Sequence, residues 1–334
     1  MPGVCILTEG GFDKGLGHIS RCLALYQIFV SHKCDVRIIV NADPSVKHIL
    51  NGYDFLLADW NQCEKKIIKI IESADLLIID SYHCQIDLYE FFSKLSPLVV
   101  YIDDFNRVDY PKGIVVNGAI GAEKINYVVR KNKEFLLGVD YAFLRKEFWY
   151  LPNKIIKKEI SSVLVFCGGF DTKRINKKVL ESLIKFYPSL DISVIVRDLE
   201  IPDIDFIKAN SNVFFNLNAN EVMNLMFNSD IAITASGQTT YELSRTGTPF
   251  IPIKTADNQT LSINEFLNLG LVGDIVNYDD FNFSNKIIEE FEKLRSDQLR
   301  KERSLNLQST IKGEGPKRIV EKLLTKINKK NEKR

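Results

Sequence analysis

Short apolar segments alternate with amphipathic stretches along most of the chain. In the first half, the apolar segments of strand length are residues 4–8, 36–40, 76–80, 98–102 and 114–117. Most of them are apolar at nearly every position, which is typical of strands whose two faces are both covered by helices. The pattern therefore predicts a parallel sheet with helices on both sides, the α/β class.

The same alternation restarts after a polar, lysine-rich stretch at residues 152–159. The strand-like segments of this second half are residues 163–166, 192–196, 213–215, 231–234 and 250–253. Beyond residue 279 the pattern is helical only, and it ends in an amphipathic stretch that begins near residue 317. We expect two α/β domains, over 1–150 and 151–312, and a C-terminal helix and tail over 313–334 that can pack back on the first domain.

Composition and charge narrow the class of ligand. The chain has 334 residues, 44 Lys and Arg against 43 Asp and Glu, and a formal net charge of +1. This balance provides no broad positive field for nucleic acid, so we expect a small-molecule substrate and no nucleic-acid partner. No apolar stretch approaches the roughly 18 residues of a membrane span, and the N-terminus lacks the pattern of a secretion signal. We therefore expect a cytoplasmic monomer without membrane insertion.

The cysteines and histidines show no ligand-set motif. The six cysteines never reach CxxC spacing, and the four histidines form no HxxxH or HExxH pair. Buried, reduced thiols are the favoured interpretation of the cysteines. We expect no metal and no cofactor.

A glycine-rich turn follows the first strand-like segment. Four glycines fall within residues 10–17, and His18 stands where a helix is predicted to begin. Glycines permit a tight turn and close ligand approach, and a helix N-terminus offers unpaired N–H groups to an anion. The alternative is that the glycines serve packing and His18 caps the helix, and spacing alone does not separate the two. The dinucleotide fingerprint GxGxxG does not fit, because Ser20 occupies the place of its third glycine.

Polar residues also end the next strand-like segments. Asp80 and Tyr82 follow the third segment, and Asp103 and Asp104 follow the fourth. The carboxyl ends of parallel strands share one edge of a sheet, where open α/β sheets bind ligands. We therefore expect these ends to converge on that edge, although capping of a helix or turn is the favoured role for Asp103 and Asp104 individually.

In the second half, the turn at residues 235–242 is the strongest candidate. Its small and hydroxyl residues could present N–H and O–H donors to a diphosphate, and Glu242 could accept hydrogen bonds from ribose hydroxyls. An ordinary capped helix is the alternative. Two further loops, at residues 167–171 and 256–259, are predicted at the same edge and favour a ligand.

Taken together, these segments resemble GT-B-fold nucleotide-sugar enzymes, and within them the UDP-2,4-diacetamido-2,4,6-trideoxy-β-L-altropyranose hydrolase family of pseudaminic acid biosynthesis. The resemblance spans most of the chain, and its order and spacing are specific. The segments are 15–23, 80–82, 103–104, 137–148, 167–171, 236–242, 258–259 and 312–318. It implies two Rossmann-like domains that face each other across a cleft, with the sugar bound by the first and UDP by the second.

The resemblance also implies roles for individual residues. His18 matches the catalytic histidine that activates or orients water at the anomeric carbon, and Tyr82 and Asp80 match neighbouring sugar-side positions. The implied substrate-binding residues are Gly15, Gly17, Arg21, Gly168, Gly169, Ser236, Gly237, Gln238, Thr239, Glu242, Asn258 and Gln259. One departure is that Thr8-Glu9-Gly10 stands where the family usually shows an Arg-x-Asp pattern, and those side chains would shape the sugar pocket.

The implied reaction is metal-independent release of UDP from a UDP-linked sugar by attack of water at C1. A GT-B glycosyltransferase is the alternative enzyme, since an acceptor hydroxyl could replace water at the same site. A nucleotide-sugar-binding module is the alternative outside catalysis.

Overall fold

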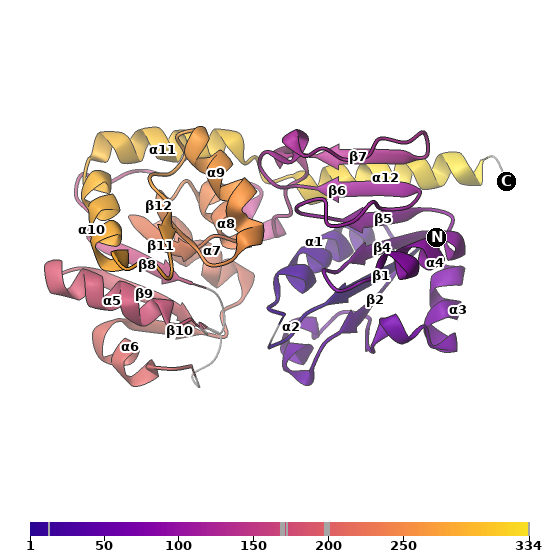
Figure 1. Ribbon diagram of the computed structural model, residues 1–334, viewed down its shortest axis with the longest axis horizontal. Coiled ribbons are helices and arrows are strands. Elements are labelled where there is room, and N and C mark those ends of the chain that lie inside the picture. The colour runs from indigo at the N-terminus through magenta and orange to yellow at the C-terminus, as the bar shows by residue number, and fades with distance from the viewer. Residues whose placement is uncertain (13, 168–170, 172, 197–200, 333–334) are drawn as a thin grey trace. The chain divides into compact units, whose positions relative to one another are not determined.

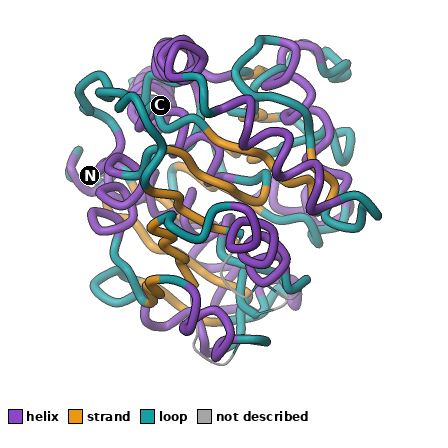
Figure 2. Tube along the Cα trace, turned by 90° about the vertical axis from the view of Figure 1, so that its left-hand side faces the viewer, coloured by secondary structure: helices purple, strands orange, loops and turns teal. Residues whose placement is uncertain are grey.

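The computed structural model describes residues 1–12, 14–167, 171, 173–196 and 201–332. The chain divides into two compact units (Figure 1). The first unit contains Met1–Arg145 together with Glu314–Arg334, and the second unit contains Lys146–Gly313. Each unit has a parallel sheet with helices around it, and the strands are drawn in orange in Figure 2.

The sheet of the first unit is built from seven described strands. They are β1 (Gly3–Glu9), β2 (Asp35–Asn41), β3 (Phe55–Leu57), β4 (Leu76–Asp80), β5 (Val99–Ile102), β6 (Gly113–Asn117) and β7 (Lys133–Leu137). The strands are parallel and lie in the order β3-β2-β1-β4-β5-β6-β7. The direction of winding changes between β1 and β4, and ligands of doubly wound folds bind at the carboxyl ends of strands at such a point.

The predicted strands of this half are all present, and two further strands were not predicted. The three residues of β3 are each only partly buried, and β7 carries two charged residues at its start. Neither segment has the continuous apolar pattern by which the buried strands were predicted.

Helices from both ends of the chain surround this sheet. They are α1 (Gly17–Ser31), α2 (Lys47–Leu50), α3 (Lys65–Ser73), α4 (Ile86–Leu95) and α12 (Gly315–Asn331). The last of these packs against α1, and its apolar side chains Ile319, Val320, Leu323 and Ile327 are buried. The C-terminal helix is therefore part of the first unit.

The second unit has the same architecture. Its strands are β8 (Ser162–Phe166), β9 (Asp191–Val196), β10 (Asn212–Phe215), β11 (Ile231–Ala235), β12 (Phe250–Lys254) and β13 (Val276–Asn277), parallel and in the order β10-β9-β8-β11-β12-β13. Its helices are α5 (Ile175–Phe186), α6 (Ile204–Asn210), α7 (Ala219–Asn228), α8 (Gln238–Thr246), α9 (Thr260–Asn268), α10 (Phe283–Leu294) and α11 (Asp297–Thr310). Valines, leucines and isoleucines of β8, β9, β11 and α5 form the centre of its apolar core.

Candidate functional site

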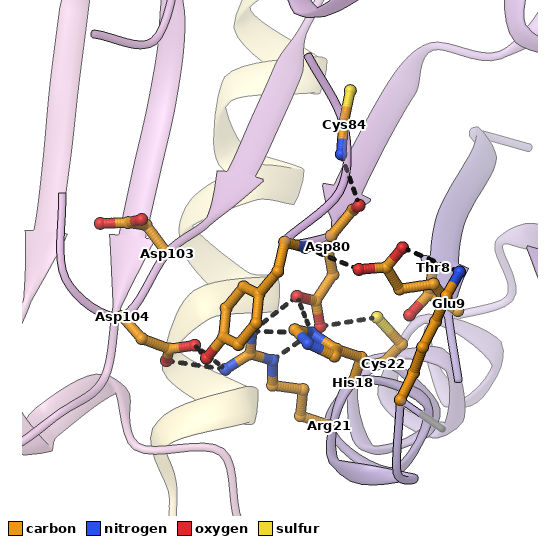
Figure 3. A network of polar contacts seen from close by, with 12 residues as sticks. Thr8, Glu9, His18, Arg21, Cys22, Asp80, Cys84, Asp103 and Asp104 are labelled. Carbon is orange, nitrogen blue, oxygen red and sulfur yellow. Dashed lines mark hydrogen bonds and ion pairs between the residues drawn. The ribbon is translucent and has the colours of Figure 1, made fainter. Parts of the chain in front are cut away.

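Asp80, the last residue of β4, lies between two side chains from the first turns of α1 (Figure 3). The Nδ1 atom of His18 lies 2.7 Å from Asp80 Oδ1, and Arg21 donates from Nε and Nη2 to the two carboxylate oxygens, each at 2.6 Å. All three residues are at least nine-tenths buried. Because an ionised carboxylate only accepts hydrogen bonds, Asp80 fixes the proton of His18 on Nδ1 and leaves Nε2 as an acceptor.

Charge balance keeps this network ionised. Burial by itself would raise the pKa of Asp80, but the charges and hydrogen bonds of Arg21 and His18 hold that pKa well below its ordinary value. Burial opposes the charge of Arg21 as well, yet Asp104 and Asp80 raise its pKa well above the ordinary value. Arg21 is therefore a permanent cation that holds the carboxylates of Asp80 and Asp104, and its Nη2 also lies 3.1 Å from Nδ1 of His18.

Asp104, just beyond β5, extends the network. It accepts two hydrogen bonds from Arg21 Nη1, at 2.8 and 2.9 Å, and a third from the hydroxyl of Tyr82. Burial and the charge of Asp104 raise the pKa of Tyr82, so its hydroxyl remains a neutral donor. The Tyr82 ring meets the His18 ring edge to face, with centroids 4.4 Å apart. The predicted residues His18, Asp80, Tyr82 and Arg21 are thus brought together.

The two neighbouring aspartates behave differently. Asp103 accepts hydrogen bonds from the N–H groups of Asn106 and Arg107 and from the hydroxyls of Tyr110 and Tyr127. It therefore stabilises the turn, as expected. The capping role favoured for Asp104 is wrong, since its carboxylate accepts hydrogen bonds from Arg21 and Tyr82 and caps no helix or turn within the described residues.

The glycines before α1 also divide into two kinds. A Cβ atom on Gly10 would come within 2.4 Å of Ile19 Cδ1 and 3.0 Å of the Gly15 oxygen, so this glycine allows close packing against Ile19. A Cβ on Gly15 or Gly17 would meet no atom within 4 Å, and Gly15 has a φ of +71° that favours glycine. The helix has no side-chain cap at Leu16, and His18 bonds to Asp80 instead. The capping alternative for His18 is therefore wrong.

In the second unit, α8 begins at the carboxyl end of β11. Its N-cap residue, Gly237, is exposed, has room around its Cα, and leaves the helix without a side-chain cap. The hydroxyl of Ser236 donates to the Ile253 carbonyl at 2.9 Å, so this proton serves the sheet edge. Gln238 and Thr239 form the first helical positions, and Glu242 follows as a buried carboxylate.

The other predicted loops of this unit give a mixed result. Gln259 ties its own loop together, since its Oε1 accepts from the N–H groups of Thr255 and Ala256, while Asn258 is exposed. Gly168 and Gly169 lie outside the described residues. Asp171, from the same loop, accepts hydrogen bonds from the first two N–H groups of α5, and burial raises its pKa to about 6. The start of α5 is therefore already occupied by a carboxylate.

Glu9 is a site residue that the sequence did not identify. It ends β1, is fully buried, and accepts hydrogen bonds from the Tyr82 N–H at 2.7 Å and from His83 at 2.9 Å. The apolar pattern predicts a strand that ends at Thr8 and places Glu9 in the turn, whereas β1 extends to Glu9. Glu9 could have been identified from strand pairing, because β1 pairs with β4 in a register that places Thr8 opposite Asp80.

Two further observations concern ions and membranes. Across the described ranges, no three or more His, Cys, Asp and Glu side chains are grouped as a metal site would require. Each described helix is too short or too polar to cross a bilayer.

The chain was compared with known protein families, curated proteins and solved structures. No protein-family model matches the chain. The "Pseudaminic acid cytidylyltransferase and UDP-2,4-diacetamido-2,4,6-trideoxy-beta-L-altropyranose hydrolase" of Helicobacter pylori is 26% identical over 274 residues, which are 81% of this chain and 48% of that protein. An uncharacterised protein of Methanocaldococcus jannaschii is 26% identical, over 79% of this chain and 58% of its own length. The chain thus spans about half the length of these two relatives.

A third relative is nearer in length. The spore coat polysaccharide biosynthesis protein SpsG of Bacillus subtilis is 24% identical over 293 residues, which are 81% of this chain and 83% of SpsG.

Solved structures agree on the architecture. MurG of Acinetobacter baumannii has a TM-score of 0.68 at 14% identity, over 97% of this chain and 100% of MurG. The calicheamicin glycosyltransferase CalG4 has a TM-score of 0.65 at 12% identity, over 97% and 98%. The chain therefore has the α/β fold of GT-B proteins, and its homologues include SpsG and the Helicobacter pylori protein named above for its cytidylyltransferase and UDP-sugar hydrolase activities.

Proposed function

We propose that this protein hydrolyses a UDP-linked diacetamido-trideoxy sugar and releases UDP. The observation that carries the proposal is the buried Asp80–His18 pair at the point of the first sheet where α/β folds bind ligands. The name of the Helicobacter pylori relative includes this hydrolase, and SpsG belongs to polysaccharide biosynthesis. Both names support a role in the biosynthesis of a surface glycan.

The pair supplies the base that hydrolysis needs. His18 Nε2 takes a proton from water while the water oxygen attacks C1 and the C1–O bond to the diphosphate breaks. UDP leaves as a stable anion, so no strong acid is required on that side. Asp80 then stabilises the imidazolium that forms, and attack opposite to UDP inverts the configuration at C1.

The second unit is proposed to hold UDP. The backbone N–H groups of Gln238 and Thr239 lie at the start of α8, and the exposed N-cap glycine, whose own N–H donates to the Ala235 carbonyl, lets a diphosphate approach them. The start of α5, in contrast, is filled by Asp171. Glu242 is proposed to bind the ribose, and Gly168, Gly169, Asn258 and Gln259 stay predictions for the same ligand.

The decisive experiment measures UDP release. Purified protein is incubated with UDP-2,4-diacetamido-2,4,6-trideoxy-β-L-altropyranose and other UDP-sugars without an acceptor, and UDP is followed by chromatography. We expect release from the first sugar and a loss of about 100-fold or more in His18→Ala, because the general base is removed. His32→Ala is the matched control, since His32 is exposed at the opposite end of α1. Equal rates in the two variants would contradict the proposed role.

A glycosyltransferase is the second candidate. The solved structures of similar fold include the glycosyltransferase CalG4, and an acceptor hydroxyl could be deprotonated by the same His18. UDP release that depends on an added acceptor would favour transfer. Binding of the UDP-sugars without release under either condition would favour a binding module. Monomeric state, cytoplasmic location and independence from metals and cofactors stay predictions.

A further inference from the structure

A second carboxylate lies beside the Asp80–His18 pair. Glu9 ends β1, and β1 pairs with β4 in a register that places Thr8 opposite Asp80. Glu9 therefore lies at the same sheet edge, one residue further along, and Figure 3 shows its carboxylate near that pair. Its side chain is fully buried.

Three donors satisfy this buried carboxylate. Its Oε1 accepts the Tyr82 N–H at 2.7 Å and lies 2.9 Å from Nδ1 of His83, while its Oε2 lies 3.5 Å from Lys14 Nζ. Burial acts to raise the pKa of Glu9, but the hydrogen bonds from His83 and from the Tyr82 N–H hold that pKa below its ordinary value. Glu9 is therefore an ionised acceptor.

An ionised acceptor determines the tautomer of the imidazole that faces it. Glu9 holds the His83 proton on Nδ1, so Nε2 carries the lone pair in the neutral ring. About 61% of the His83 side chain is exposed, and Nε2 makes no hydrogen bond to the described part of the chain. The His83 backbone N–H donates to Ser81 Oγ at 3.0 Å, which fixes the start of the side chain. The arrangement repeats that of Asp80 and His18.

We propose that His83 is a second imidazole that contacts the sugar in this site, with Nδ1–H held by Glu9 and Nε2 accepting a hydrogen bond from an N–H or O–H group of the sugar. The inference rests on the proposed function and extends it to recognition of the sugar. A diacetamido-trideoxy sugar has lost hydroxyl groups but carries two amide N–H donors, and an exposed imidazole acceptor is complementary to such a donor.

Two substitutions separate this role from a structural one. In His83→Asn the amide N–H₂ stands near the place of Nδ1, so it can still donate to Glu9, but no atom replaces Nε2. In His83→Gln the longer side chain places an amide oxygen near the position of Nε2. If His83 acts only by holding Glu9, His83→Asn should bind the nucleotide sugar as tightly as the parent protein does. If His83 Nε2 contacts the sugar, His83→Gln should keep most of the affinity and His83→Asn should lose it.

The measurement is binding, so that it does not depend on turnover. Kd is determined by calorimetry for UDP and for UDP-2,4-diacetamido-2,4,6-trideoxy-β-L-altropyranose, in a His18→Ala background if the parent protein hydrolyses the sugar. We expect His83→Asn to raise Kd for the nucleotide sugar about 10-fold, the loss of one hydrogen bond, and to leave Kd for UDP unchanged. His83→Gln should recover most of this loss. Thermal unfolding of each variant provides the check on folding.

Three results would overturn the inference. They are an unchanged Kd for the nucleotide sugar in His83→Asn, an equal change in both Kd values, and a parent protein that binds the nucleotide sugar no more tightly than UDP. Failure of the proposed hydrolysis is a separate outcome, in which the sugar binds in a His83-dependent manner but the parent protein never releases UDP.

Discussion

Asp104 fixes the far end of the network that starts at His18. Its two oxygens hold Arg21 and Tyr82 at the same time, so the guanidinium cannot rotate away from Asp80 and the phenol stays against the imidazole. Residues that orient a catalytic group through hydrogen bonds commonly affect the rate by one to two powers of ten. We therefore expect Asp104 to affect the proposed reaction through Arg21 and Tyr82.

Asp103→Asn and Asp104→Asn are a matched pair that tests whether Asp104 acts on the rate while Asp103 acts on stability. We expect Asp104→Asn to lower kcat for UDP release about 10- to 100-fold, because Arg21 loses part of its compensating charge. We expect Asp103→Asn to act mainly on stability and to lower the free energy of unfolding by about 1–3 kcal/mol, because its carboxylate accepts several turn hydrogen bonds. Rates and thermal unfolding are measured for both. Equal effects of the two substitutions on rate would contradict the assignment.

Glu242 is the residue of the second unit with the clearest predicted role. Glu242 is buried in α8, and its carboxylate is proposed to accept hydrogen bonds from the ribose hydroxyls, so its removal should weaken UDP binding. We expect Glu242→Ala to raise Kd for UDP about 10-fold or more, as loss of hydrogen bonds to a charged acceptor would do. Isothermal titration with UDP measures this, with circular dichroism as the test of folding. An unchanged Kd in a folded variant would exclude Glu242 from the nucleotide site.

At this scale, the sequence could predict that His18, Asp80 and Tyr82 lie together, because each stands at the carboxyl end of a strand or the start of a helix. It could not separate Asp103 from Asp104, since adjacent positions at a strand end point to different surroundings. It also missed the link between Glu9 and His83, which are 74 positions apart and meet only because β1 and β4 pair.

Among the elements, β8 and β11 are joined at their amino ends by one carboxylate. Asp230 accepts hydrogen bonds from the N–H groups of Ser161 and Ser162, at 2.9 and 3.0 Å, and from both serine hydroxyls. Burial by itself would raise the pKa of Asp230, but these bonds and Lys157 lower it to about 2. The carboxylate therefore clamps two central strands at the edge opposite to the proposed UDP site.

The sign of this shift predicts a pH dependence. The pKa of Asp230 is lower in the folded protein than the ordinary value of 3.8, so its stabilisation is complete above about pH 4 and is lost as pH falls toward about 2. We expect Asp230→Asn to reduce the free energy of unfolding by about 1–3 kcal/mol at pH 7. The difference from the parent protein should shrink between pH 4 and pH 3. Urea unfolding at pH 7, 4 and 3 measures it, and a constant difference would argue against the clamp.

Element prediction depended on burial. Strands that are buried on both faces, such as β4 and β11, have continuous apolar sequences and were predicted. The strands β3, β7 and β13 lie at or near sheet edges and are short or only partly buried, so their sequences lack this pattern. Their pairing is decided by neighbouring strands, which a local pattern does not report.

At the scale of the whole molecule, the C-terminal segment after residue 313 packs against the first unit. Gly315 opens α12 against the backbone of Ala142, whose oxygen would lie 2.1 Å from a Cβ atom at position 315. Arg318 then pairs with Asp140 at 2.7 Å, and Lys326 pairs with Glu134. Parts of two motifs of the sequence resemblance, residues 137–145 and 314–318, therefore meet within the first unit and stabilise it.

This arrangement predicts that the first unit depends on α12. Deleting residues 314–334 removes four buried apolar side chains, each of which contributes about 1.5–3 kcal/mol. Their sum is comparable with the whole stability of a domain, so we expect the first unit to unfold. Circular dichroism and limited proteolysis measure this, and removal of residues 333–334 alone is the control. A deletion variant in which residues 1–145 remain protected from protease would contradict the prediction.

The place of α12 has a consequence for synthesis on the ribosome. The second unit has all of its residues once Gly313 has been added, whereas the first unit still lacks its last helix at that time. The first unit therefore begins to be synthesised before the second unit but is completed after it. In a nascent chain the apolar surface of α1 that α12 covers stays exposed until α12 has been made, and chaperones could bind that surface during this interval.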